Sequence, residues 1–235
     1  MSRAARRVQL AAGYVLHHRP YRDSSRIVEV FTLEHGRLTL FARGARGPKS
    51  SLAPLLQPFR PLLLSFLLGR GDAAQLTGAE LAHPAAPAPR ADSLMSAYYL
   101  NEVLLKLTER LDPQPAVYEA YVRAVQGLCG SGTEAAVLRE FELTLLEACG
   151  YGIDFADLDS AGRYLFTAGS GFAPSDVADS LSGSVLLGVA QRDWHDAAVL
   201  AAASRVLRAA LDHCLDGYEI RTRAVARSIR RQVQR

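Results

Sequence analysis

The sequence predicts an α+β protein in which a small N-terminal β-barrel is followed by an α-helical domain. Three observations support this. Apolar and polar residues alternate in short runs over residues 1–82, prolines interrupt the chain at 83–90, and from residue 91 apolar residues recur at helical spacing. With 235 residues, 49% of them hydrophobic and 22% charged, the chain is long enough for two packed units.

The first domain, residues 1–82, contains five segments with strand character, at 9–18, 26–33, 37–43, 61–68 and 74–81. Between the second and third, Glu34-His35-Gly36 forms a hairpin loop in which Gly36 can adopt a positive φ. Residues 50–56 predict a short helix before Pro58. Five strands with one helical connection match an OB-type barrel in size and order. An SH3-like barrel is the alternative on strand count alone.

Residues 83–90 contain Pro84, Pro87 and Pro89, and we interpret them as the domain linker because neither a helix nor a strand continues through them. The second domain, 91–235, predicts helices from Asp92 or Ser93 to Pro113 and over 117–128, 133–149 and 196–215. A glycine-rich stretch at 151–191 is expected to be irregular. The strand 61–68 is apolar on both faces, which predicts that the helical domain covers this side of the barrel.

Charge is unevenly distributed along the chain, although the net charge is only +3. Residues 1–82 contain 12 Lys or Arg against 5 Asp or Glu, whereas residues 91–219 contain 8 against 19. The segment 220–235 has six arginines and no acidic residue. A polyanion would therefore be attracted to the two ends of the chain and repelled by its middle.

Several function classes are disfavoured by what the sequence lacks. The acidic residues of the barrel are scattered, there is no GxxxxGK[ST] phosphate loop, and Cys129, Cys149 and Cys214 lie too far apart for a typical metal site. No apolar run is long enough to span a bilayer, and the N-terminus does not resemble a secretory signal. We therefore expect a cytoplasmic protein without catalytic residues or a cofactor; a small nuclease or transferase is the enzymatic alternative.

The strand 37–43 indicates a nucleic-acid surface. Alternation places Leu38, Leu40 and Ala42 inside the barrel and leaves Arg37, Phe41 and Arg43 outside, where arginines flank a ring on which a base can stack. The alternative is that Phe41 packs under the helical domain and the arginines are only solvated. The tail, 220–235, predicts an amphipathic helix with arginines on one stripe. With this helix and the neighbouring loops, the candidate contacts are Arg19, Tyr21, Arg22, Arg26, Arg37, Phe41, Arg43, Arg46, Lys49, Arg223, Arg227, Arg230 and Arg231.

Several runs of residues resemble the bacterial recombination mediator family RecO. In the first domain they are GYVLHHRPYRDSSRIVEVFT (13–32), HGR (35–37), FARGARG (41–47) and LQPF (56–59). In the second they are AYYLNEVLL (97–105), LREFELTLL (138–146) and GYG (150–152). The resemblance covers residues 1–155 well and the rest loosely.

This resemblance implies an OB barrel with a helical domain and an ATP-independent role in recombinational repair. It implies binding and annealing of single- and double-stranded DNA, and partnership with RecR and single-strand-binding protein in loading RecA. It also implies no zinc, since 153–162, where many members carry cysteines, has none. For the acidic, Phe-ending tail of single-strand-binding protein it implies a cationic, apolar pocket, with Arg139 and Phe141 as candidates beside Val137 and Leu145. The residues alone leave open a general OB-fold module for single-stranded RNA.

Overall fold

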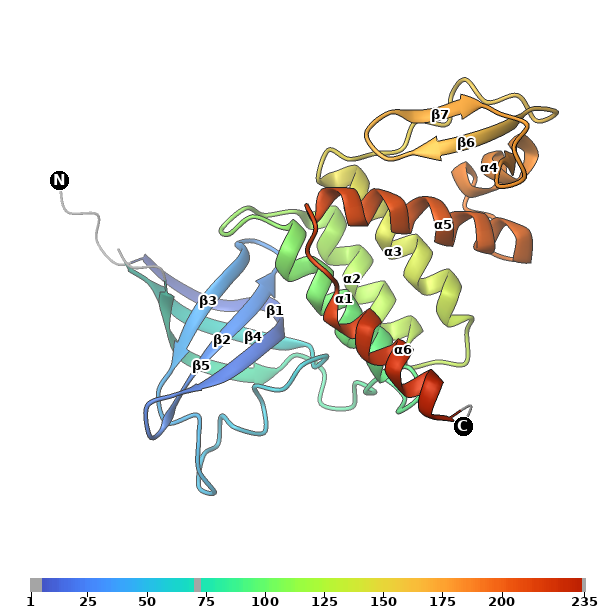
Figure 1. Ribbon diagram of the computed structural model, residues 1–235. Helices are drawn as coiled ribbons and strands as arrows, with labels where there is room; N and C mark the ends of the chain where they lie inside the picture. The colour runs from blue at the N-terminus through green and yellow to red at the C-terminus, as the bar shows by residue number, and fades with distance from the viewer. Residues whose placement is uncertain (1–5, 70–72, 234–235) are drawn as a thin grey trace.

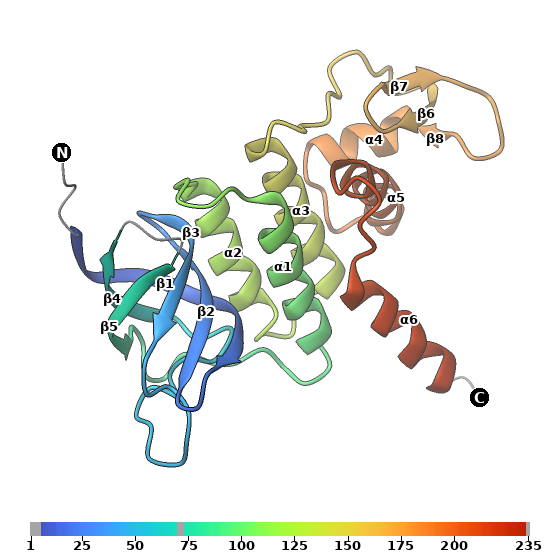
Figure 2. The same cartoon turned by 60° about the vertical axis from the view of Figure 1, so that its left-hand side comes forward.

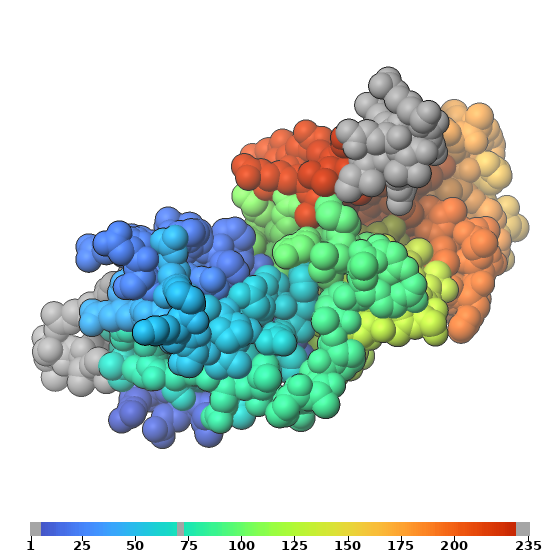
Figure 3. Space-filling model, turned by 90° about the horizontal axis from the view of Figure 1, so that it is seen from below, coloured from blue at the N-terminus to red at the C-terminus, as the bar shows by residue number. Residues whose placement is uncertain are grey.

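The computed structural model describes residues 6–69 and 73–233, and side chains up to residue 228. A barrel, blue to teal, and a helical domain, green to red, lie next to each other in both ribbon views (Figures 1 and 2). Residues 83–90 have no helix or strand and are mostly exposed. Seen from below, the two parts form one continuous, elongated body (Figure 3).

The predicted five-stranded barrel is confirmed. Its strands are β1 (Arg6–Tyr21), β2 (Ser25–Thr32), β3 (Gly36–Ala42), β4 (Leu62–Leu68) and β5 (Ala73–Leu81). They close in the order β1-β2-β3-β5-β4, with β3 and β5 parallel and the other neighbours antiparallel. β1 is longer than predicted because register shifts at Val8/Ala11 and Val15/His17 let one strand bend along the barrel and pair on both sides.

The interior of the barrel follows the predicted alternation, with Leu38, Leu40 and Ala42 all buried. The short helix expected at 50–56 is wrong, since this segment consists of turns. The Ser50 hydroxyl donates to the Gly44 carbonyl at 2.6 Å and accepts from the Ala53 amide at 3.1 Å. Such local side-chain bonds to the backbone compete with helical hydrogen bonding.

The predicted helices are present as α1 (Leu94–Leu107), α2 (Pro115–Gly127), α3 (Glu134–Ala148), α5 (Ala197–Cys214) and α6 (Arg221–Val233). α1 ends before the predicted stop at Pro113, because Thr108 is extended and Leu111 has a positive φ. The expectation that 151–191 is irregular is wrong. β6 (Arg163–Thr167), β7 (Gly171–Pro174) and β8 (Leu181–Ser182) form a small sheet followed by α4 (Gly183–Ala190). Gly169 and Gly171 adopt positive φ in the β6–β7 turn, and the Phe166 and Phe172 rings lie 5.0 Å apart. The glycines therefore shape turns between ordered elements.

The helical domain packs on β1 and β2, which corrects the expectation that it covers β4. Tyr14, Leu16 and Phe31 share one hydrophobic core with α1 and α2, whereas Leu63 and Leu67 of β4 are half-buried. The two-sided apolar pattern of β4 misled the prediction because single apolar side chains are common on exposed surfaces.

A second contact joins the β2–β3 hairpin to the segment after α1. The Arg37 guanidinium donates to the Thr108 carbonyl at 2.8 and 3.1 Å, and the Leu111 amide donates to the Arg37 carbonyl at 2.8 Å. Gly36, with a φ of +61°, lies against the backbone of Asp112. The barrel and the helical domain therefore contact each other at two places, at β1 and at the β2–β3 hairpin.

Asn101 of α1 is buried where the helical domain packs on β1. Leu16 has no partner in the β1–β2 register, and its carbonyl accepts from Asn101 Nδ2 at 2.8 Å; Asn101 Oδ1 accepts from the Tyr121 hydroxyl at 2.7 Å. Asn101→Ala is expected to lower the free energy of unfolding by about 2 kcal/mol, because it leaves a buried carbonyl and a buried hydroxyl without partners.

Chemical denaturation measures this loss, and Tyr121→Phe provides the second arm of a double-mutant cycle. Because Asn101 and Tyr121 share a hydrogen bond, Tyr121→Phe should cost less in the Asn101→Ala background than alone. Fully additive losses would contradict the proposed coupling.

Candidate nucleic-acid interface and helical pocket

Two aromatic rings and two arginines form a compact group where the β1–β2 turn meets the end of β3. This end of the barrel is drawn lowest in Figure 1. Tyr21 ends β1 and Phe41 lies near the end of β3, and their ring centroids are 5.4 Å apart in an edge-to-face arrangement. The Arg22 guanidinium lies 5.3 Å from the Tyr21 ring and that of Arg43 lies 5.8 Å from the Phe41 ring. We call these four residues the aromatic platform. It combines positive charge with π surfaces, as single-stranded nucleic-acid sites do.

The loops around the aromatic platform are held together by Arg46. Its amide donates to the Ser24 carbonyl at 3.1 Å and its guanidinium donates to the Arg22 carbonyl at 2.9 Å. Arg22 itself has a φ of +52°. A shallow hollow of about 360 Å³ lies here, lined by Arg22, Asp23, Ser24, Ser25, Phe41 and Arg43. Arg46 thus contributes to the shape of the turn as well as to its charge.

The other predicted contacts of the barrel divide into exposed and engaged side chains. Arg19 and Lys49 are exposed, and both lie within a few residues of the aromatic platform along the chain. Arg26 is partly buried and donates weakly to the Ala53 carbonyl at 3.5 Å.

Arg37 does not point outward as predicted. Its side chain is only 16% exposed, because it donates to Thr108 and lies 3.7 Å from the Glu29 carboxylate. Burial lowers the pKa of Arg37, and the charge of Glu29 opposes that effect. The helical domain covers the hairpin end of β3, so the accessible part of this region is its far end, where Phe41 is half-buried and Arg43, just after the strand, is exposed.

The basic stripe predicted on α6 is divided in the same way. Arg223 is 20% exposed and donates to Asp212 Oδ1 at 2.8 Å and to the Tyr99 hydroxyl at 2.9 Å, so its assignment as a DNA contact is wrong. Arg227 is 62% exposed and pairs with Glu219 at 2.5 Å. The side chains of Arg230 and Arg231 lie outside the described part.

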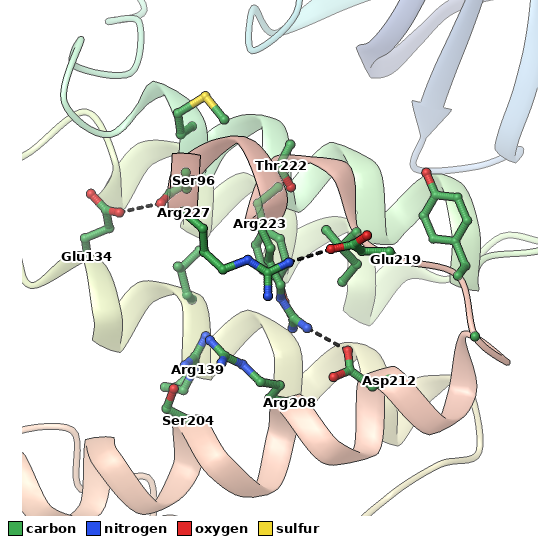
Figure 4. Close-up of a pocket in the computed structure, with 17 residues that line it drawn as sticks. Ser96, Glu134, Arg139, Ser204, Arg208, Asp212, Glu219, Thr222, Arg223 and Arg227 are labelled. Atoms are coloured by element: carbon green, nitrogen blue, oxygen red, sulfur yellow. Dashed lines mark hydrogen bonds and ion pairs between the residues drawn. The ribbon is translucent and has the colours of Figure 1, made fainter. Parts of the chain in front are cut away.

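A pocket of about 550 Å³, open to solvent on one side, is lined by α1, α3, α5, α6 and the segment before α6 (Figure 4). Arg139 lines it, together with Leu138, Met95 and Ile220. Phe141 was a wrong choice, since it is 1% exposed and packs on Tyr121 in the core; Leu145 is also buried. Positions two residues apart differ by about 200° around a helix, so Phe141 faces away from Arg139.

Polar groups from three helices continue from the pocket into the core. Glu142 Oε1 accepts from Arg139 Nη2 at 2.6 Å and from the Tyr99 hydroxyl at 2.6 Å, and Tyr99 in turn accepts from Arg223. Burial, and then the charge of Glu142, raises the pKa of Tyr99 well above its ordinary value. The local pair of Arg139 with Glu142 can be anticipated from their spacing, but sequence reasoning missed Tyr99, because its bonds to Glu142 and Arg223 join segments far apart in the chain.

The first turn of α6 is held by a carboxylate of α1. Glu102 accepts from the Arg221 amide at 2.7 Å, from the Thr222 amide at 2.9 Å and from the Thr222 hydroxyl at 2.7 Å. Burial raises the pKa of Glu102, but these hydrogen bonds outweigh it and lower the pKa overall. A negative charge at a helix N-terminus is favourable. Glu102 therefore fixes the helix that forms one wall of the pocket.

Within residues 6–69 and 73–233, no group of three or more His, Cys, Asp or Glu is arranged to hold a metal ion. In the same part of the chain, no helix is long and apolar enough to cross a membrane.

A closed five-stranded barrel with basic loops around partly exposed rings is characteristic of OB-fold proteins that bind single-stranded nucleic acid. The chain is an OB-fold protein with an attached helical domain. Residues 8–85 match Recombination protein O N terminal, and residues 90–162 match Recombination protein O C terminal. The chain belongs to the recombination protein O family, RecO.

Similarity to members of this family extends beyond those matches. The DNA repair protein RecO of Azoarcus sp. (strain BH72) is 37% identical over 237 residues, which cover 95% of this chain and 97% of the relative. The DNA repair protein RecO of Haemophilus influenzae (strain 86-028NP) is 38% identical over 224 residues, 92% of this chain and 94% of the relative. The similarity therefore includes most of the C-terminal region.

Proposed function

We propose that this chain is a non-enzymatic mediator of recombinational DNA repair, which binds single- and double-stranded DNA and anneals complementary strands without ATP. It acts in the bacterial cytoplasm, at the nucleoid, with RecR and single-strand-binding protein, and assists the loading of RecA. The observation that carries the proposal is the aromatic platform on a basic OB barrel. Membership of the RecO family supports it.

The geometry suggests how a strand would lie on the barrel. Bases stack on Tyr21 and Phe41, while Arg22 and Arg43 meet the adjoining phosphates. Arg19 and Lys49 are exposed and extend the positive surface, and Arg46 shapes the turn that carries Arg22. Because every base has a π face and every nucleotide a phosphate, this surface binds strands with little sequence preference.

The pocket of the helical domain suits the acidic, Phe-ending tail of single-strand-binding protein. Its lining includes four arginines, at positions 139, 208, 223 and 227, and apolar side chains of Leu138, Met95 and Ile220. Carboxylates of the tail would meet the arginines, and the terminal ring would pack against the apolar wall. The helical domain is acidic overall, but the arginines make this pocket locally basic, and such electrostatic complementarity favours an acidic partner here.

The decisive experiment follows annealing of complementary DNA strands that are coated with single-strand-binding protein, in the absence of ATP. We expect faster annealing with the protein than without it, and no acceleration when the tail of the coating protein is deleted. Absence of annealing on both naked and coated strands would contradict the proposal. Complementary RNA strands provide the comparison with a general single-strand-binding module.

Leu138→Ser tests the tail site. We expect about tenfold weaker binding of an acidic peptide ending in phenylalanine, because an apolar wall is lost, and unchanged binding of naked DNA. Isothermal titration with peptide and with DNA measures both. Leu94→Ser is the control, since Leu94 is an exposed leucine of α1 that does not line the pocket. Arg139→Glu is a poorer probe because it removes the partner of buried Glu142.

A further inference from the structure

The four arginines of the pocket differ in how far they are already neutralised. Arg139 pairs with Glu142 at 2.6 Å, Arg223 with Asp212 at 2.8 Å and Arg227 with Glu219 at 2.5 Å. Arg208, on α5, is exposed and has no hydrogen-bond or ion-pair partner within the described residues. Two of the paired acids, Asp212 and Glu219, line the pocket themselves (Figure 4).

The three pairs also differ in how readily a ligand could open them. Glu142 is 1% exposed and also accepts from Tyr99, so the Arg139 pair is part of the core. Arg223 is largely buried and also bonds to Tyr99, so it keeps a partner if Asp212 moves. Arg227 and Glu219 are 62% and 70% exposed. An exposed pair of this kind contributes little to stability, so it is the one that a competing carboxylate can displace.

The position of Glu219 allows such a displacement. It lies in the segment between α5 and α6, close to Gly217, whose φ is +82°. The neighbouring Ile220 is 3% exposed and anchors the chain in the core, and Glu102 holds the first turn of α6. The Glu219 side chain can therefore leave Arg227 while the backbone and α6 stay in place.

We propose that Glu219 is an internal competitor for the pocket: it neutralises Arg227 in the free protein and is displaced by an acidic peptide, whose first contact is Arg208. This rests on the proposed function of the pocket. The affinity of the pocket then depends on the number of carboxylates in the ligand, because only a ligand with several of them can both engage Arg208 and displace Glu219. A neutral peptide with the same apolar end would gain neither contact.

The test is a fluorescence anisotropy titration with a labelled peptide that contains several aspartates and ends in a free phenylalanine. Glu219→Gln should bind it about two- to fivefold more tightly than the unmodified protein, which is the range expected for removing one exposed ion pair. Arg208→Gln should bind it about fivefold more weakly. Glu119→Gln is the matched control, because it removes an equal charge from an exposed pair with Arg123 on α2, outside the pocket.

The gain expected for Glu219→Gln cannot arise from damaged folding, and it should shrink as salt is raised. Equal or weaker binding by Glu219→Gln, or equal tightening by Glu119→Gln, would overturn the proposed competition. Failure of the pocket itself is distinguishable. In that case neither Leu138→Ser nor Arg208→Gln would change peptide binding.

Discussion

Gly36→Ala is expected to lower the free energy of unfolding by about 3 kcal/mol, the largest loss of stability that we predict for a single substitution. Gly36 has a φ of +61°, a conformation that costs an L-residue about 1–2 kcal/mol. A Cβ here would lie 2.1 Å from the Asp112 carbonyl oxygen and 2.5 Å from its carbon. Both are backbone atoms, so relief requires the segment after α1 to move, at a cost of roughly 1–3 kcal/mol.

Calorimetry measures this loss, which corresponds to a melting temperature about 6–12 °C lower for a chain of this length. Gly44→Ala is the matched control, since Gly44 has a φ of +65° but a Cβ added there would have no atom within 4 Å. It carries the conformational cost alone, about 1–2 kcal/mol. Equal losses for the two substitutions would show that the hairpin does not press against Asp112.

Reversing both charges of the aromatic platform, with Arg22→Glu and Arg43→Glu together, is expected to weaken binding to single-stranded oligonucleotides at least about 100-fold at low salt. Two phosphate contacts are lost and two repulsive charges are introduced. The dependence of log K on log salt should become shallower by roughly 1.4, from about 0.7 for each lost contact. The loss should be similar for oligonucleotides of different sequence, because phosphates carry no sequence information.

Fluorescence titration over a range of salt concentrations measures both quantities. Arg123→Glu with Arg205→Glu is the control, because it makes the same change of net charge on exposed residues of the helical domain. An unchanged slope for the platform variant would rule out these phosphate contacts. Arg22 and Arg43 are exposed, so the melting temperature should change little. Arg37 is unsuitable for this test, because its loss would disturb the contact with Thr108.

The wrong assignments share a physical cause. Alternation along β3 correctly separates Leu38 and Leu40 from Arg37 and Phe41, but it cannot tell that the segment after α1 covers Arg37 and leaves Phe41 partly exposed. The arginines of α6 do have the spacing of one helical face, yet Arg223 bonds to Tyr99 because α6 lies along α1. A pattern within one element indicates which residues share a face; it does not indicate what that face meets.

The sequence by itself determined the order of the barrel strands and of the helices α1, α2, α3, α5 and α6, the barrel interior, the uneven distribution of charge and the resemblance to the RecO family. These depend on local rules, namely side-chain periodicity, turn residues and the order of short motifs. Only the tertiary structure decided the side of the barrel that meets the helices, the small sheet at 163–182 and the pocket with Arg208 and Glu219. Each of these depends on contacts between residues distant in the chain, whose geometry is set by the packing of whole elements against one another.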